Sequence, residues 1–268
     1  MPVLRRYRVL IPLAAVVVIG PVLVVAAPAG AQPVVRYVAL GDSYAAGDGA
    51  GNYYGGPCGE SANAYPALWA AANHPAGYAA KTCDGATTGS VISGQLSALS
   101  GSTTLVSLTV GGNDVGFSTV METCVLYSTS TCVSAINTAE GKISADLPGE
   151  LDSVLAAIST RAPNARVVVT DYPHLYDLSK SSSCVGLSTT KRTALNQGAD
   201  LLDGQIQAAA ERHGDWFADV RPTFAGHEIC DSDSYLNSVN WLDLEGSYHP
   251  NAAGQAKGYL PAFSALAG

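Results

Sequence analysis

Short runs of apolar residues, many of them β-branched, recur along this 268-residue chain and alternate with longer segments of helical spacing. A strand covered on both faces is apolar along its whole length, so such runs predict a parallel sheet between two layers of helices. We therefore predict a three-layer α/β/α sandwich with a mainly parallel sheet of about five strands. Strands are expected at 34–40, 77–82 (the weakest), 104–110, 165–170 and 216–220, and helices at about 61–72, 91–99, 143–160, 190–213 and 251–266.

The first 31 residues have the layout of a secretory signal peptide. Three arginines stand among the first eight residues, and an apolar run from Val9 ends in Ala29-Gly30-Ala31. A retained membrane anchor is the alternative, because a spanning helix needs roughly 20 apolar residues. Gly20-Pro21 within the run and the Ala-x-Ala ending favour cleavage. We expect a secreted, extracellular protein without a stable membrane anchor, whose single domain covers residues 32–268.

The charge of the chain argues against one class of partner. The formal net charge is −8 at pH 7, and it becomes −11 without residues 1–31, which carry three arginines and no acidic residue. Phosphate backbones repel an acidic surface, so the composition excludes general nucleic-acid binding.

All six cysteines lie beyond residue 31, at Cys58, Cys83, Cys124, Cys132, Cys184 and Cys230. An even number of cysteines in an exported chain predicts three disulfides. The short interval makes Cys124–Cys132 the favoured local pair, although fifteen pairings are possible from sequence. Cys-x-x-Cys pairs, which would indicate a metal site, do not occur.

Polar motifs follow three of the predicted strands. Gly41-Asp42-Ser43-Tyr44 follows the first strand, and Gly111-Gly112-Asn113-Asp114 follows the strand at 104–110. The carboxyl ends of parallel strands are where ligands bind in open α/β sheets. A serine hydroxyl there can act as a nucleophile, and an asparagine amide can stabilise an oxyanion. Gly85, after the weak strand, allows a backbone N–H to approach a ligand closely. Each motif alone is also compatible with a simple polar turn.

A serine nucleophile needs a base, and His249 is the histidine with a distinctive context. It stands in Ser247-Tyr248-His249-Pro250-Asn251, directly before the last predicted helix. The other four histidines are expected to satisfy local hydrogen bonds or to face solvent; they are His74, His174, His213 and His227.

The order of these blocks resembles the SGNH hydrolases, also called GDSL esterases and lipases. The resemblance extends from Val34 to the final helix, and the segments 37–43 and 109–114 with the six cysteines are most similar to the secreted actinobacterial lipase and phospholipase branch. It implies a flavodoxin-like sheet and hydrolysis of lipid or other carboxylic esters through an acyl-enzyme on Ser43, with His249 as the base.

The same resemblance implies the remaining parts of the site. The oxyanion hole would consist of the Ser43 and Gly85 backbone N–H groups and the Asn113 side chain. The cysteines would pair in sequence order, as Cys58–Cys83, Cys124–Cys132 and Cys184–Cys230. No metal or organic cofactor is implied, and we expect a monomer that acts on a lipid or other small-molecule ester.

One position departs from the family pattern. Many members have an aspartate three residues before the catalytic histidine, and this chain has Gly246 there. Asp243 and Glu245 lie nearby at other spacings, so either carboxylate remains an alternative. We expect the backbone carbonyl of Gly246 to orient the imidazole, which leaves a Ser-His dyad.

Other protein classes fit less well. An α/β-hydrolase needs Gly-x-Ser-x-Gly and a nucleophile well inside the chain, whereas Ala45 replaces the last glycine and Ser43 comes early. A trypsin-like protease is all-β, with histidine before serine. Two alternatives remain within the preferred fold. One is a carbohydrate acetyl esterase, and the less favoured one is a non-catalytic secreted binding module.

Overall fold

The computed structural model contains a five-stranded sheet with all neighbouring strands parallel, in the order β2-β1-β3-β4-β5. The strands are β1 (Arg36–Gly41), β2 (Gly77–Ala80), β3 (Leu105–Thr109), β4 (Arg166–Thr170) and β5 (Trp216–Ala218). Every residue of β3 is buried, as expected for a strand covered on both faces. The sheet confirms the predicted fold class and places β1, which leads to Ser43, inside the sheet.

The structure describes residues 2, 34–54, 56–180, 184–242 and 244–268. The predicted cleavage site at residue 31 and the acidic candidate Asp243 lie outside these residues. No helix within the described ranges is both long and apolar enough to cross a bilayer.

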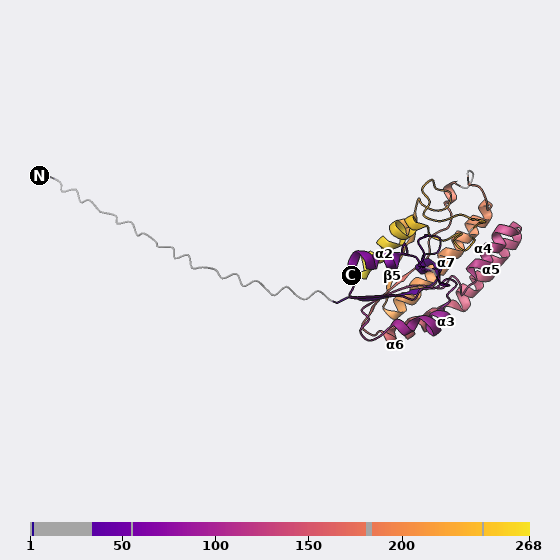
Figure 1. Ribbon diagram of the computed structural model, residues 1–268. Coiled ribbons are helices and arrows are strands. Elements are labelled where there is room, and N and C mark those ends of the chain that lie inside the picture. The colour runs from indigo at the N-terminus through magenta and orange to yellow at the C-terminus, as the bar shows by residue number, and fades with distance from the viewer. Residues whose placement is uncertain (1, 3–33, 55, 181–183, 243) are drawn as a thin grey trace. The chain divides into compact units, whose positions relative to one another are not determined.

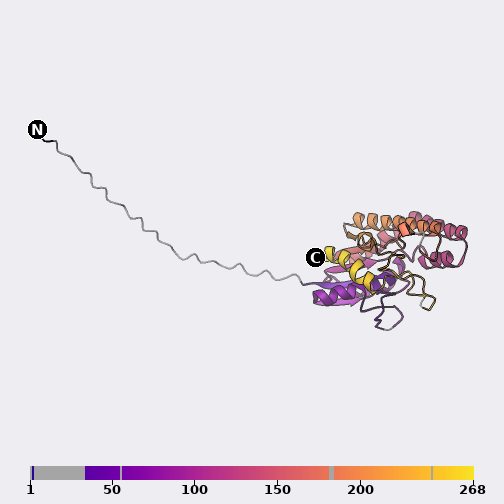
Figure 2. The ribbon, with the colours of Figure 1, turned by 90° about the horizontal axis from the view of Figure 1, so that it is seen from above.

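Helices cover both faces of the sheet (Figures 1 and 2). One layer contains α2, η4 and α9, and the opposite layer contains η1, α6 and α7. The α-helices are α1 (Ser43–Ala46), α2 (Tyr65–Asn73), α3 (Thr88–Ser90), α4 (Phe117–Leu126), α5 (Thr129–Ala145), α6 (Leu147–Arg161), α7 (Thr189–His213), α8 (Arg221–Phe224) and α9 (Leu260–Ala267). The remaining turns are η1 (Val91–Gln95) and η4 (Gly254–Tyr259), both π-helical, and the 3₁₀ turns η2 (Leu96–Ala98) and η3 (Leu178–Lys180).

The two helical layers pack on the sheet with different side chains. Under α2 and α9, the rings of Tyr37, Trp69 and Phe263 lie 5.2 to 5.8 Å apart between centroids. On the other face, α6 buries an aliphatic stripe that includes Leu151 and Leu155. Each such side chain contributes about 1.5 to 3 kcal/mol when fully buried. The sheet that supports Ser43 is therefore fixed from both sides.

Two of the longer helices were not predicted, nor were the short helices α1, α3 and α8, and one prediction was too long. The structure has α4 and α5 between β3 and α6, where serine and threonine residues interrupt the apolar pattern of a helix. The helix expected at 143–160 is interrupted, because α5 ends at Ala145 and α6 begins at Leu147. Pro148 stands in the first turn of α6, where its missing N–H costs no helical hydrogen bond.

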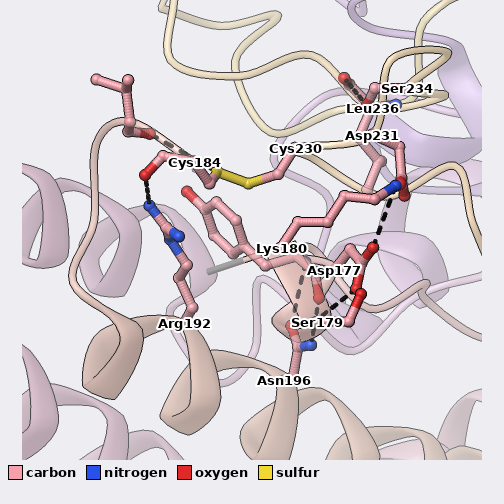
Figure 3. Close-up of a disulfide and its surroundings, with 12 residues drawn as sticks. Asp177, Ser179, Lys180, Cys184, Arg192, Asn196, Cys230, Asp231, Ser234 and Leu236 are labelled. Atoms are coloured by element: carbon pink, nitrogen blue, oxygen red, sulfur yellow. Dashed lines mark hydrogen bonds and ion pairs between the residues drawn. A yellow bond between two sulfur atoms is a disulfide. The ribbon is translucent and has the colours of Figure 1, made fainter. Parts of the chain in front are cut away.

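Three disulfides cross-link the chain in the pairing that the family resemblance implies: Cys58–Cys83, Cys124–Cys132 and Cys184–Cys230. Figure 3 shows the third. Beside it, Arg192 of α7 donates to the Cys184 carbonyl at 2.7 Å, and Lys180 pairs with Asp231. This bridge fixes the loop after α8, which leads toward the segment that contains His249.

Candidate active site

Ser43 is the first residue of α1, directly after the turn that ends β1. Gly41 has a φ of +132°, and a Cβ at this position would lie 2.3 Å from the Thr109 carbonyl oxygen, so the close approach of β1 to β3 requires glycine. The Asp42 carboxylate caps α1 by accepting the Tyr44 N–H at 3.0 Å. The turn therefore holds the serine hydroxyl at the carboxyl edge of the sheet.

Asp42 connects this turn to two other strand ends. Its side chain accepts a hydrogen bond from the Tyr172 hydroxyl, which in turn accepts the Gly112 N–H at 3.2 Å. Asp42 is only 1% exposed, and burial raises the pKa of its carboxyl group to about 7, although the bonds from Tyr172 and Tyr44 oppose the rise. Sequence analysis did not identify Tyr172, because no local motif surrounds it.

His249 lies within hydrogen-bond distance of Ser43. Its Nε2 is 2.7 Å from the Ser43 Oγ, and its Nδ1 is 3.0 Å from the carbonyl oxygen of Ser247. We had expected the carbonyl of Gly246 at Nδ1, and the structure places Ser247 there instead. Tyr248 adopts a left-handed conformation with φ +63°, which turns the Ser247 carbonyl back toward the ring. The Gly246 carbonyl accepts from Asn237 Nδ2 at 3.1 Å.

The backbone around His249 is held by a short pairing. Asn237 donates its N–H to the His249 carbonyl at 2.9 Å and accepts the Tyr248 N–H at 3.0 Å. The Tyr44 hydroxyl donates to the Tyr248 carbonyl at 2.7 Å. Because Tyr44 follows Ser43 directly, this bond ties the histidine loop to the serine turn.

Gly85 and Asn113 also lie at the carboxyl edge, on loops that are joined to each other. Asn113 donates from Nδ2 to the Ala86 carbonyl at 3.1 Å, and Asp114 accepts the Thr88 hydroxyl at 2.6 Å. Within the described part of the chain, the backbone N–H groups of Ser43 and Gly85 meet no protein acceptor. These two donors and the second hydrogen of the Asn113 amide remain for a ligand.

An apolar pocket opens beside Ser43 and Asn113. Its walls come from α4, α5, α7 and the loop after β4, with few polar groups among them. They include Val120, Ile136, Ile143, Leu175, Leu195 and Leu202. Such a pocket suits a hydrocarbon group, because its walls offer apolar contacts. Sequence analysis missed this pocket together with α4 and α5.

The other histidines make local contacts away from Ser43. His174 contacts Asp200 at 2.8 Å, His213 lies 3.3 Å from Asp152, His227 stacks on Tyr235, and His74 ends α2. Among the residues that the structure describes, no group of three or more His, Cys, Asp or Glu side chains is arranged to hold a metal ion.

The parallel sheet and its strand-end motifs define the class of SGNH hydrolases. The family model for the GDSL-like Lipase/Acylhydrolase family matches residues 39–257, and the chain belongs to this family. The family resemblance predicted from the sequence is therefore confirmed, and the protein is a carboxylic ester hydrolase.

Similar proteins from Streptomyces are lipases and a phospholipase. Lipase 1 of Streptomyces coelicolor is 50% identical over 270 residues, which span 98% of this chain and 100% of the relative. The crystal structure of phospholipase A1 from Streptomyces albidoflavus NA297 has a TM-score of 0.85 at 49% identity, over 87% of this chain and 100% of that one. That of an extracellular lipase from Streptomyces rimosus has a TM-score of 0.84 at 47% identity, over 87% and 99%.

Proposed function

We propose that this protein is a secreted lipase or phospholipase that cleaves carboxylic esters with long acyl chains, using Ser43 as the nucleophile and His249 as the base. One observation carries the proposal: Ser43, whose Oγ lies 2.7 Å from His249 Nε2, lines the apolar pocket. The names of the relatives, lipase and phospholipase A1, support the same substrate class.

Acylation begins when His249 Nε2 takes the proton from Ser43 Oγ and the oxygen attacks the ester carbonyl carbon. The carbonyl oxygen becomes an oxyanion, which the Ser43 and Gly85 N–H groups and the Asn113 amide stabilise. The protonated imidazole then gives its proton to the leaving alcohol, and the acyl group remains on Ser43. In deacylation the same histidine takes a proton from water, and the hydroxide attacks the carbonyl carbon of the acyl-enzyme. The bond to Ser43 Oγ then breaks, the fatty acid is released, and the imidazolium returns its proton to Ser43 Oγ.

The Ser247 carbonyl supports the role of His249. A carbonyl at 3.0 Å from Nδ1 accepts the proton on that nitrogen, so Nε2 is left as the acceptor that faces Ser43. The carbonyl carries no formal charge and stabilises the imidazolium less than a carboxylate does. The oxyanion donors therefore carry a larger share of the catalysis in this dyad.

Secretion is the other part of the proposal. The first 31 residues have a basic start, an apolar middle and a small-residue cleavage motif. Three disulfides in the described domain favour an oxidising compartment. N-terminal sequencing of the protein from culture medium tests this part; a mature chain that begins near Gln32 supports it, and an intact Met1 contradicts it.

The catalytic assignment is tested by labelling with a fluorophosphonate and mapping the adduct. We expect the label on Ser43 and no label on a Ser43→Ala variant. A comparison of p-nitrophenyl acetate, p-nitrophenyl laurate and acetylated xylan tests the substrate class. The apolar pocket predicts that laurate is preferred; a preference for acetylated xylan would instead favour a carbohydrate esterase.

A further inference from the structure

Tyr172, in the loop after β4, lies between the two segments that carry proposed oxyanion donors. Its hydroxyl donates to the Asp42 carboxylate and accepts the Gly112 N–H at 3.2 Å. Asp42 directly precedes Ser43, and Gly112 directly precedes Asn113. One hydroxyl group therefore links the backbone beside the first donor to the backbone beside the second.

The Tyr172 side chain is itself held in place. It is 7% exposed, and its ring packs edge-on against that of Tyr44, with 5.0 Å between the centroids. Its backbone N–H donates at 3.2 Å to Oδ1 of Asp203, a buried residue of α7. The ring lines the apolar pocket, while the hydroxyl is bonded to Asp42 and Gly112. The hydroxyl is thus a fixed point between the two segments.

The serine turn is also held by side chains other than Tyr172. Gln95 of η1 accepts the Gly41 N–H and donates to the Gly41 carbonyl, both at 2.8 Å. Gln255 of η4 donates to the Tyr44 carbonyl at 2.9 Å. Both glutamines are buried. Because these bonds fix the chain on either side of the nucleophile, loss of the Tyr172 hydroxyl should leave the nucleophile in place.

The segment that carries Asn113 depends more strongly on Tyr172. It begins with Gly111 and Gly112, and glycine backbones have more conformational freedom than those of other residues. A Cβ at Gly112 would lie 3.4 Å from Tyr172 Cζ, so the backbone passes close to the ring. Without the hydroxyl, the Gly112 N–H would face ring carbon and lose its acceptor, which is unfavourable for a buried group. The glycine pair should then move, and Asn113 with it.

We propose that Tyr172 is a positioning residue, which holds the Asn113 amide at the distance from the Ser43 N–H that the oxyanion of the transition state requires. This inference rests on the proposed function, in which both groups stabilise the oxyanion. The Tyr172 hydroxyl gives its own proton to Asp42, so it acts through Asn113 and not on the substrate. Placement matters because a shift of about 1 Å in a catalytic group can cost about 100-fold in rate.

The test is a double-mutant cycle between Tyr172→Phe and Asn113→Ala. Phenylalanine keeps the ring and removes only the hydroxyl. On p-nitrophenyl butyrate, Tyr172→Phe alone should lower kcat about tenfold, a part of the roughly 10²- to 10³-fold that one donor supplies, with KM within about twofold. In the Asn113→Ala background the same substitution should lower kcat by about twofold or less. The effect shrinks because the group that Tyr172 positions is then absent.

Two further measurements examine the same link. Asp42→Asn approaches it from the other end: asparagine still caps α1, but its one side-chain oxygen cannot accept both the Tyr44 N–H and the Tyr172 proton. We expect a loss in kcat that likewise shrinks in the Asn113→Ala background, which also decides the matter if Tyr172→Phe does not fold. An alkyl trifluoromethyl ketone, which forms an oxyanion on a catalytic serine, should bind about tenfold more weakly to Tyr172→Phe.

Tyr37→Phe is the matched control. Tyr37 is also buried, and its hydroxyl lies 2.7 Å from Ser107 Oγ. It stands near the start of β1, whereas Ser43 follows the end of that strand. Tyr37→Phe should lower Tm and leave kcat within about twofold, with or without Asn113→Ala, because it removes a buried hydroxyl bond that does not reach the oxyanion donors.

Four results would overturn the inference. They are an unchanged kcat in Tyr172→Phe, a tenfold loss that persists in the Asn113→Ala background, an equal loss in Tyr37→Phe, and a raised KM with unchanged kcat. The last would make Tyr172 a residue that binds the acyl chain. Failure of the proposed function is a separate result, because Ser43→Ala would then keep its activity on p-nitrophenyl butyrate.

Discussion

The two pockets beside the Ser43–His249 pair differ in almost every physical respect. The apolar pocket is walled by aliphatic side chains of three helices. The other, which we call the acidic pocket, is formed by loops and is lined by Asp48, Tyr53, Glu60, Asp84 and Glu245. Apolar walls are stabilised by removal of their surface from water, whereas carboxyl groups gathered in one pocket raise one another's pKa, as Asp84 and Glu245 do for Asp48.

The pockets also differ in how firmly they are built. The Cys124–Cys132 bridge joins α4 to α5, and the buried Lys191 of α7 donates to the carbonyls of Cys124 and Tyr127 at 2.6 Å. These links hold the helices of the apolar pocket together. The acidic pocket depends on the Cys58–Cys83 bridge and on turns near Gly49. We expect changes in the apolar pocket to alter acyl selectivity and changes in the acidic pocket to alter the pH dependence of stability.

The largest expected effect comes from the pair between the pockets. His249→Ala should reduce kcat/KM by about 10⁴-fold or more for every ester, because the base is lost whatever the acyl or alcohol half. Glu245→Gln should cost far less, since Ser247 supplies the partner at Nδ1. Rates on p-nitrophenyl butyrate and on a phospholipid measure both. If Glu245→Gln proved as damaging as His249→Ala in a folded protein, a carboxylate triad would replace the dyad.

Asn113→Ala should come next, with a loss of about 10² to 10³-fold in kcat, or about 2.7 to 4 kcal/mol. The amide contributes mainly when negative charge develops on the ester oxygen, so KM should change little. Steady-state kinetics with a short and a long acyl ester separate the two constants. A large rise in KM with unchanged kcat would show that Asn113 binds the substrate and does not stabilise the oxyanion.

Filling the apolar pocket should change the preference for acyl length by about tenfold, on the order of 1.4 kcal/mol. Gly198 of α7 lines this pocket, and a Cβ there would lie in ordinary contact with Ile136 at 3.7 Å, so the side chain of Gly198→Leu should occupy part of the pocket. The ratio of kcat/KM for laurate to butyrate esters should fall. Gly204→Leu, on the same helix with open space around it, is the control. If the ratio fell in both variants, the cause would be a loss of α7 stability and not the filling of the pocket.

The smallest effect is on stability and concerns Asp48. The pKa of the Asp48 carboxyl group is raised from the ordinary 3.8 to about 8 in the folded protein. The stability that the protonated form contributes to the fold is therefore fully present below about pH 4 and is lost as the pH rises through 8. Asp48→Asn cannot ionise and should therefore be more stable than the wild-type protein at pH 8.5, by about 2 to 4 °C in Tm for each kcal/mol, with little difference at pH 4. Thermal scans at both pH values measure this. Equal gains at both would point to a cause other than ionisation.

Much of the framework could be predicted from the sequence, because its signals are local. The buried strands are continuous apolar runs, and Gly41-Asp42-Ser43 follows the first of them directly. The partner of the histidine was missed by one residue, since the direction of the Ser247 carbonyl depends on the left-handed Tyr248. No motif in the sequence indicated the acidic pocket. Asp48, Asp84 and Glu245 lie on separate loops, and only the folded sheet brings them together.

The nucleophile and the base are 206 residues apart, with Ser43 after the first strand and His249 close to the C-terminus. Under the proposed roles, a growing chain carries its serine through almost the whole of synthesis without a base. The site is completed only when the last loop is released and folds back against the start of the domain. A chain that stops before residue 249 therefore has the proposed nucleophile without its base.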